Sequence, residues 1–358
     1  MPENEPIEQE TRRAIAANEQ AGILEANRIF DLMCLSIFAL PLVKVYLSRA
    51  IALPISDTTS MIQLSKSIDA VIKKTLDQLY TSLHGRTVKS WLLGEKLSIA
   101  TLNGRIPLNA LKMLKLKEAA TAAHREKAMN AFIDRTTKGL NLSGRVWRME
   151  PAIKIQIETV LQLAINDGRS AIETANDLKK YLRNPDQLFR RVRDAAEKLV
   201  LSKAAKQYRP GIGVYHSPYA NALRLARNEV LKAYRRAEWQ QIQGFDFMTG
   251  QRIQLSNNHP VKDICDNLQG IYPKSFQWSG WHVACRCHML TELISLDNFV
   301  KMEAGTYTPK QTTEYPQAFH VWIDSNRARI KPDSGIDWIE DTPEVKAMFS
   351  RKTRLKPQ

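Results

Sequence analysis

Thiol and imidazole side chains gather in one short stretch near the C-terminal end of the 358-residue chain. Three of its four cysteines and three of its seven histidines lie between residues 259 and 288. Thiolate and imidazole are ligands that zinc prefers, and four of them converging form a closed structural site. The stretch therefore predicts a zinc site, the alternative being unpaired thiols with histidines nearby by chance. The candidate ligands are Cys265, Cys285, Cys287, His282 and His259.

The spacing of these residues differs from that of a common zinc finger. His259 and Cys265 are separated by five residues, 16 residues follow, and His282-x2-Cys285-x-Cys287 completes the cluster. Two cysteines one residue apart can both turn their sulfurs to one side of a turn. We expect three thiolates and one imidazole to fill a tetrahedral site, with either His282 or His259 as the fourth ligand.

A catalytic zinc would need an open coordination position and a nearby general base. The carboxylates beside the cluster are Asp263 and Asp266, and neither stands in an arrangement such as His-Glu-x2-His. The sequence also lacks a glycine-rich phosphate loop, a Gly-x-Ser-x-Gly motif and a dinucleotide-binding fingerprint. We therefore expect no enzymatic activity. Arg286 is expected to donate hydrogen bonds to a thiolate or to the backbone.

Three short motifs give the chain a resemblance to a known family. Cys265-Asp-Asn-Leu-Gln-Gly270 and His282-Val-Ala-Cys-Arg-Cys287 resemble the cysteine segments of the phage head morphogenesis domain, found in Mu F-like minor head proteins. Ala226-Arg-Asn-Glu229 resembles the Ala-Arg-Thr-Glu that this family carries on a long helix before its cysteines. Val283 replaces a proline of the family pattern, and Lys262 replaces the first cysteine of its Cys-x2-Cys pair.

The resemblance implies a minor head protein that is present in few copies. Such a protein associates with the portal and with the major capsid or scaffold protein, and it aids head assembly and DNA packaging or retention. It would be assembled in the host bacterial cytoplasm and reside in the virion near the portal. The alternatives are a zinc-containing DNA-binding protein and, less favoured, a metal-dependent enzyme.

The charge balance points to an anionic partner. Lysine and arginine number 52 against 37 aspartates and glutamates, which gives a net charge of +15. The most apolar stretch, Leu32 to Val43, has 12 residues including a proline, whereas a bilayer span needs about 20. It is expected to be a buried helix or a docking surface, and no membrane association is expected. Four cysteines do not make a disulfide scaffold, and Met1 to Glu10 carries four glutamates, which is the wrong charge for a signal peptide.

Basic residues concentrate on two predicted helices, at about 183–209 and 224–236. These helices are amphipathic with small residues on their apolar faces, which suits phosphate contacts better than base readout. We therefore expect binding to double-stranded DNA that does not depend on sequence. The candidate contacts are Arg190, Arg191, Arg193, Lys198, Arg224, Arg227, Arg235 and Arg236.

Apolar periodicity predicts helices over most of the chain. A helix or helix pair is expected over 8–53, broken near Pro41, and an amphipathic helix over 60–92. Residues 93–106, with two glycines, are expected to form a connector before a helix over 108–136. In the second half, helices are expected to begin at Pro151, Ser170, Pro185 and Pro218.

Beyond Gly244 the apolar period changes from that of a helix to that of a strand. Phe245 and Phe247, then Ile253 and Leu255, alternate around Thr249-Gly250, which predicts a hairpin. After Leu296 the chain is expected to be loop-like. Its apolar residues are expected to dock on this protein or on a partner: Phe319, Trp322, Ile330, Trp338 and Ile339.

The predicted fold is mainly α, an elongated helical body with a small β-rich, zinc-pinned knuckle near the C-terminus. The N-terminal helical region covers 1–140, and the helical part of the head-morphogenesis domain covers 141–243. The Cys/His knuckle covers 244–295, and a C-terminal extension covers 296–358.

Overall fold

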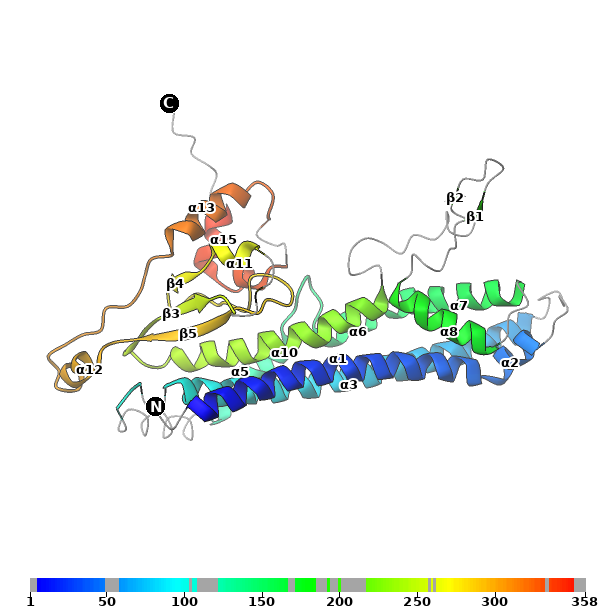
Figure 1. Ribbon diagram of the computed structural model, residues 1–358, viewed down its shortest axis with the longest axis horizontal. Coiled ribbons are helices and arrows are strands. Elements are labelled where there is room, and N and C mark those ends of the chain that lie inside the picture. Colours follow the sequence, from blue (N-terminus) through cyan, green and yellow to red (C-terminus); the bar gives the residue numbers. More distant parts are fainter. Residues whose placement is uncertain are drawn as a thin grey trace, which may run out of the picture. The chain divides into compact units, whose positions relative to one another are not determined.

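The computed structural model describes residues 5–48, 58–102, 105–107, 122–166, 171–184, 192–193, 199–200, 217–256, 259, 262–331 and 335–350. Over these residues the protein is mainly helical, with a small antiparallel sheet near the C-terminus (Figure 1), so the predicted fold class is confirmed. The chain divides into two compact units. Unit 1 contains residues 1–19, 86–141 and 228–358, and unit 2 contains residues 20–85 and 142–227.

The N-terminal helices are α1 (Glu5–Ala39), α2 (Pro41–Ser48), α3 (Thr58–Leu102) and α5 (Ala122–Asp134). The predicted break at Pro41 is confirmed, because α1 ends two residues before it. The predicted connector at 93–106 is wrong for most of its length, because α3 continues to Leu102. Gly94 is a close-approach position rather than a helix breaker: a Cβ there would lie 2.6 Å from the Cα of Tyr234.

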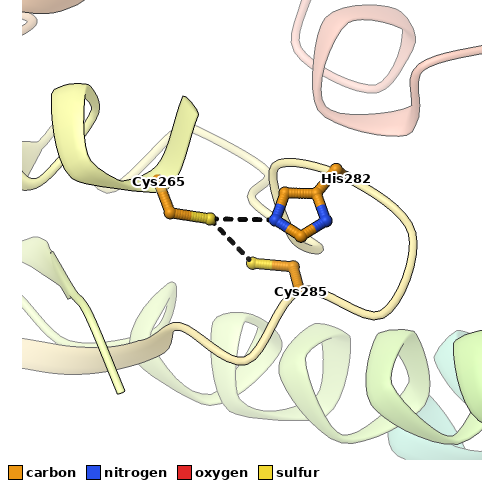
Figure 2. Close-up of side chains that lie close together, drawn as sticks. All are labelled: Cys265, His282 and Cys285. Carbon is orange, nitrogen blue, oxygen red and sulfur yellow. Dashed lines mark hydrogen bonds between the residues drawn. The ribbon is translucent and has the colours of Figure 1, made fainter. Parts of the chain in front are cut away.

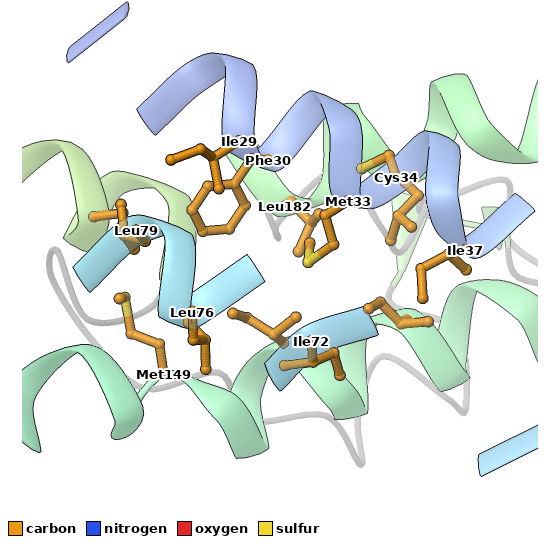
Figure 3. Packing of buried hydrophobic residues seen from close by; sticks show 14 of the residues in the cluster. Ile29, Phe30, Met33, Cys34, Ile37, Ile72, Leu76, Leu79, Met149 and Leu182 are labelled. Atoms are coloured by element: carbon orange, nitrogen blue, oxygen red, sulfur yellow. The ribbon is translucent and has the colours of Figure 1, made fainter. Parts of the chain in front are cut away.

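Unit 2 is built around one apolar core. It contains α2, α6 (Leu142–Trp147), α7 (Glu150–Asn166) and α8 (Ala171–Arg183) together with parts of α1, α3 and α10. Buried side chains of α1 face those of α3, as Figure 3 shows for Ile29, Phe30, Met33, Cys34 and Ile37 beside Ile72, Leu76 and Leu79. The predicted apolar face of α3 is confirmed.

The apolar stretch from Leu32 to Val43 belongs to this core. Met33, Ile37 and Val43 are buried, whereas Leu32 and Leu35 are exposed on the opposite side of the helix. The stretch is therefore a buried helix for most of its apolar residues. No helix of the described chain has an apolar run long enough to cross a bilayer.

The segment after α8 differs from its prediction. Where a helix is predicted from Pro185, the described residues form two short antiparallel strands, β1 (Val192–Arg193) and β2 (Leu199–Val200). Val192 pairs with Val200, and β-branched side chains favour strands over helices. The remaining residues of this predicted helix lie outside the described part of the chain.

Helix α10 (Pro218–Ile242) begins where the sequence predicts. The hydroxyl of Ser217 accepts a hydrogen bond from the amide of Ala220 at 3.0 Å, which caps the first turn. The small residues of α10 are buried: Ala222, Ala226, Ala233 and Ala237. The helix is therefore a central packing element rather than a surface helix.

The sheet has three antiparallel strands in the order β4-β3-β5: β3 (Met248–Gln254), β4 (Gly270–Tyr272) and β5 (His288–Leu293). The predicted hairpin at Thr249-Gly250 is wrong, because β3 runs through these residues as the central strand and carries a register shift between Met248 and Gly250. A Cβ on Gly250 would lie 2.8 Å from Thr312 Oγ1. Glycine therefore permits a close approach here and does not make a turn.

The C-terminal residues are more helical than predicted. They form α11 (Ile264–Asn267), α12 (Leu296–Glu303), α13 (Gln317–Asn326), α14 (Asp337–Glu340) and α15 (Pro343–Ser350). With the sheet, these helices form the C-terminal lobe, defined here as residues 244–350 (Figure 1). Its apolar tail residues dock on this protein: Phe319, Trp338 and Ile339 are each at most 1% exposed. They leave no free apolar surface for a partner at these positions.

Candidate metal centre

Cys265 is placed by a short, well-capped helix. Asp263 precedes α11, and its Oδ1 accepts a hydrogen bond from the amide of Cys265 at 2.7 Å. Asp266 completes a capping box, because its Oδ2 accepts from the amide of Asp263 at 2.7 Å. The two carboxylates that flank Cys265 in sequence therefore serve to hold the turn that presents its thiol.

Two further side chains reach Cys265 from the loop between β4 and β5 (Figure 2). The Sγ atom of Cys265 lies 3.1 Å from Nε2 of His282 and 3.7 Å from Sγ of Cys285. Metal–sulfur bonds of about 2.3 Å in a tetrahedral site give a sulfur–sulfur separation of about 3.8 Å. The two sulfurs already stand at that separation, and the three residues form a group that could hold a metal ion.

The imidazole of His282 is oriented for coordination. Its Nδ1 lies 2.8 Å from the carbonyl oxygen of Val283, and a carbonyl only accepts, so Nδ1 carries the proton. In the neutral ring the lone pair is then on Nε2, which faces Cys265 Sγ and also lies 3.1 Å from Asp263 Oδ2. A lone pair, a sulfur and a carboxylate oxygen converge at one point, which is a position that favours a cation.

The two histidines proposed as alternative ligands occupy different places. His282 converges with the cysteines, whereas Nε2 of His259 lies 3.1 Å from Asp266 Oδ2 in a separate group of His259, Asp263 and Asp266. Cys287 is buried in the same apolar cluster, but the ligand atoms that all lie within 4.8 Å of one another belong to Cys265, His282 and Cys285. The structure therefore brings together Cys265, Cys285 and His282, with Cys287 buried nearby, and it leaves His259 with the carboxylates.

The three thiols perturb one another's pKa values. Hydrogen bonds from Cys265 and Cys287 hold the pKa of Cys285 far below its usual range, and the positive charge of Arg235 acts in the same direction. The hydrogen bonds of Cys265 with Cys285 and Cys287, together with burial, raise the pKa of Cys265. One thiolate is thus favoured at the expense of the others, and a divalent cation between the sulfurs would allow all of them to ionise.

The arginine that supports the site is Arg235 of α10, which the sequence did not single out for this role. Its side chain is buried and donates hydrogen bonds to the carbonyl oxygens of Ser279 (3.0 Å), Cys285 (2.5 Å) and Cys287 (2.9 Å). Its predicted contact with DNA is therefore wrong. Arg286, expected to make such hydrogen bonds, is exposed and makes none among the described residues.

Helix α10 holds the loop that carries His282 and Cys285 at a second point. The amide of Ala284, a residue with a φ of 59°, lies 3.4 Å from Oδ1 of Asn228. Asn228 belongs to the Ala226–Glu229 motif, and its neighbour Glu229 forms an ion pair of 2.8 Å with Arg135. This helix motif and the cysteine motifs are therefore in direct contact in the folded protein.

The remaining candidate DNA contacts divide into two sets. Arg190, Arg191 and Lys198 lie outside the described residues, and Arg193 is part of β1. Arg224, Arg227 and Arg236 are half-buried on α10. Arg224 donates to Asn221, and Arg236 lies 3.7 Å from the Asp341 carboxylate. DNA contact by these residues, Arg235 excepted, stays a prediction.

The chain was compared with models of known protein families, with curated proteins and with solved structures. None of the three comparisons gave a match. The family resemblance accordingly stands on the motif residues alone.

Proposed function

We propose that the chain binds one zinc ion at a structural site formed by Cys265, Cys285, Cys287 and His282. The observation that carries this proposal is the convergence of Cys265 Sγ with Cys285 Sγ at 3.7 Å and with His282 Nε2 at 3.1 Å. Sulfur and imidazole donors in a tetrahedral arrangement are typical of zinc. His259 is not among the proposed ligands, because Asp266 engages its Nε2.

A zinc ion at this point would stabilise the C-terminal lobe. Its ligands come from α11, which has only four residues, and from a loop held by α10 through Asn228 and Arg235. Structural zinc sites contribute on the order of 10–16 kcal/mol of binding free energy, which acts as folding free energy. The ion would therefore hold two segments that have little regular structure of their own.

The surroundings of the site favour a structural over a catalytic ion. The cysteine side chains are buried, Asp266 accepts from the amide of Asp263, and Asp263 accepts through Oδ1 from the amide of Cys265, while its Oδ2 lies 3.1 Å from His282 Nε2. Four protein ligands would leave no coordination position open for water. We accordingly propose that the chain is not an enzyme.

We further propose that the protein is a phage minor head protein, associated with the portal and with the major capsid or scaffold protein, in the virion. Its support is the resemblance of the cysteine and helix motifs, together with their direct contact through Asn228 and Ala284. The net charge of +15 is consistent with work beside packaged double-stranded DNA. Aid to head assembly and to DNA packaging or retention would follow from these contacts.

The head assignment is tested with a phage that lacks this gene. Capsid and portal proteins should still be made, but the heads should be malformed, poorly filled or non-infectious. Co-expressed with the portal protein of the same phage, the chain should co-purify at a fixed low ratio. Absence from purified proheads and virions, together with no affinity for the portal, would overturn the assignment and favour a zinc-containing DNA-binding protein.

The proposed DNA contact is tested by its salt dependence. Because binding would replace counterions on phosphates, the logarithm of affinity should fall with the logarithm of salt concentration, by roughly 0.9 per phosphate contacted. Unrelated duplexes should compete equally well. Strong preference for one DNA sequence would favour a zinc-containing DNA-binding protein over a head protein. No binding at low salt would indicate that the positive charge serves to contact a protein partner.

A further inference from the structure

Arg235 is a buried cation without a carboxylate partner. Its side chain is 1% exposed, and no carboxylate of the described residues lies within ion-pairing distance of it. Glu238 lies nearby on α10, but burial raises its pKa to about 8, so it is mostly protonated at neutral pH. Burying an unpaired charge costs several kcal/mol. Something else must therefore balance the guanidinium.

The metal centre supplies the missing charge if it contains three thiolates. A divalent ion with three thiolates and a neutral imidazole carries a net charge of −1, and the guanidinium brings the total to zero. With only two thiolates the centre would be neutral, and Arg235 would remain unbalanced. The charge of Arg235 therefore indicates that Cys287 is a ligand alongside Cys265 and Cys285.

The hydrogen bonds of Arg235 also shape the loop. A single nitrogen, Nη2, donates to the carbonyl oxygens of both Cys285 and Cys287. Two carbonyls that are two residues apart can reach one donor only if the chain between them bends. This bend brings Sγ of Cys285 to 3.7 Å from Sγ of Cys265 and keeps the buried Cys287 in the same cluster.

The space for the guanidinium is built into the fold. Gly280 has a φ of 120°, and a Cβ there would lie 2.6 Å from Nη1 of Arg235. On another side, the guanidinium carbon lies 4.7 Å from the centre of the Trp278 ring. A glycine, an aromatic face and three carbonyls thus form a dedicated pocket for this side chain.

We propose that Arg235 is the positioning residue of the metal centre, which bends the Cys285–Cys287 segment through its hydrogen bonds and balances the charge of a third thiolate. The inference rests on the proposed zinc site and extends it. It assigns a ligand-orienting and charge-balancing role to a helix residue that is separated from the cysteines by about 50 residues of sequence.

The test compares two substitutions that both remove the forked guanidinium but differ in charge. Arg235→Lys keeps a positive charge, and Arg235→Gln does not. The matched control is Arg236→Gln, the next residue, which is half-buried beside Asp341. Zinc affinity of the full chain is measured by competition with a chromophoric chelator. The number of thiolates is followed by the sulfur-to-metal charge-transfer absorption of the cobalt-loaded protein.

Arg235→Gln should lower zinc affinity at least about tenfold more than Arg235→Lys and should weaken the cobalt charge-transfer band, while Arg236→Gln leaves both unchanged. Equal losses in the lysine and glutamine variants, or no loss in either, would overturn the proposal. If Arg235→Gln does not fold, Arg235→Lys decides, because the proposal requires it to retain one equivalent of zinc. If the zinc site itself is wrong, the wild-type protein will contain no metal. If only the role of Arg235 is wrong, the wild-type protein will contain zinc, and Arg235→Gln will bind zinc as tightly as the wild type.

Discussion

Glu229 of α10 and Arg135, directly after α5, form an ion pair whose carboxylate is almost completely buried. Arg135 Nη2 lies 2.8 Å from Glu229 Oε2, and the glutamate side chain is 1% exposed. The same guanidinium stacks on Phe132 and donates to its carbonyl oxygen at 2.7 Å. This pairing fixes the end of α5 to α10, the helix that contacts the loop carrying His282 and Cys285.

Replacing Glu229 with alanine should destabilise unit 1 strongly. The substitution leaves Arg135 without its partner in a mostly buried place, and breaking a buried ion pair in this way costs about 3 kcal/mol. Chemical denaturation followed by tryptophan fluorescence measures the change. The control is Glu126→Ala, an exposed glutamate of α5, which should change stability by less than about 0.5 kcal/mol. Similar losses in the two variants would contradict a special role for the pair.

Removal of one cysteine ligand should release the metal and loosen only the C-terminal lobe. We expect about one equivalent of zinc in protein purified without chelator, and much less in Cys285→Ala. Hydrogen exchange should then rise in the lobe while the helices of unit 2 stay protected. The control is Cys34→Ala, because burial raises the pKa of the Cys34 thiol to about 12 and keeps it protonated in the unit 2 core. Zinc well below one equivalent in the wild-type protein would show that the proposed zinc site is wrong.

The two histidines should behave differently in the same assay. His282→Ala removes the imidazole that faces Cys265 and should lower zinc affinity by at least about tenfold. His259→Ala leaves the cysteine group intact and should retain the metal, because the His259 ring pairs with Asp266. Loss of zinc from His259→Ala with retention in His282→Ala would reverse the assignment of the fourth ligand.

Local signals in the sequence were sufficient to predict where some helices begin or end and which stretch contains the candidate metal ligands. The proline at position 41 and the serine at position 217 act on their own turns, so the break after α1 and the start of α10 follow from sequence neighbours. The cysteine–histidine cluster is detectable for the same reason, because its members lie within 30 residues.

Roles that depend on distant partners could not be predicted in the same way. Arginine is usually a surface residue. Arg235 is buried because its guanidinium donates hydrogen bonds to carbonyl oxygens that are 44 to 52 residues away in the sequence. Gly94 and Gly250 resemble turn residues in sequence, but Tyr234 and Thr312 are the neighbours that require glycine there. The sequence does not reveal which distant residue packs against a glycine. The predictions of a connector at Gly94 and a hairpin at Gly250 were therefore wrong.

Two glycines of α3 should respond oppositely to alanine. At Gly94 a Cβ would overlap the backbone of Tyr234, and forcing atoms into such a contact costs about 1–3 kcal/mol. At Gly85 a Cβ meets nothing within 4 Å, so the better helix propensity of alanine should stabilise the protein by roughly 0.5–1 kcal/mol. Thermal and chemical denaturation of the two variants measure these changes in stability relative to the wild type. Stabilisation by Gly94→Ala would show that the packing of α3 against α10 at this point is looser than described.

Glu238 should make the stability of unit 1 depend on pH. Burial raises its pKa from 4.5 to about 8, although the charges of Arg12 and Arg235 oppose this shift. Between these two pH values the folded state binds more protons than the unfolded state, so the free energy of unfolding falls as pH rises, by up to about 1.4 kcal/mol per pH unit. Glu238→Gln cannot ionise, and its stability relative to wild type should therefore increase between about pH 5 and pH 8. Denaturation measured across this range tests the slope, with the exposed Glu314→Gln as control. Variant and wild type have the same candidate metal ligands, so any loss of metal with pH affects both proteins equally. If the two curves of stability against pH are parallel, Glu238 is already ionised in the folded protein at neutral pH, which would contradict the prediction.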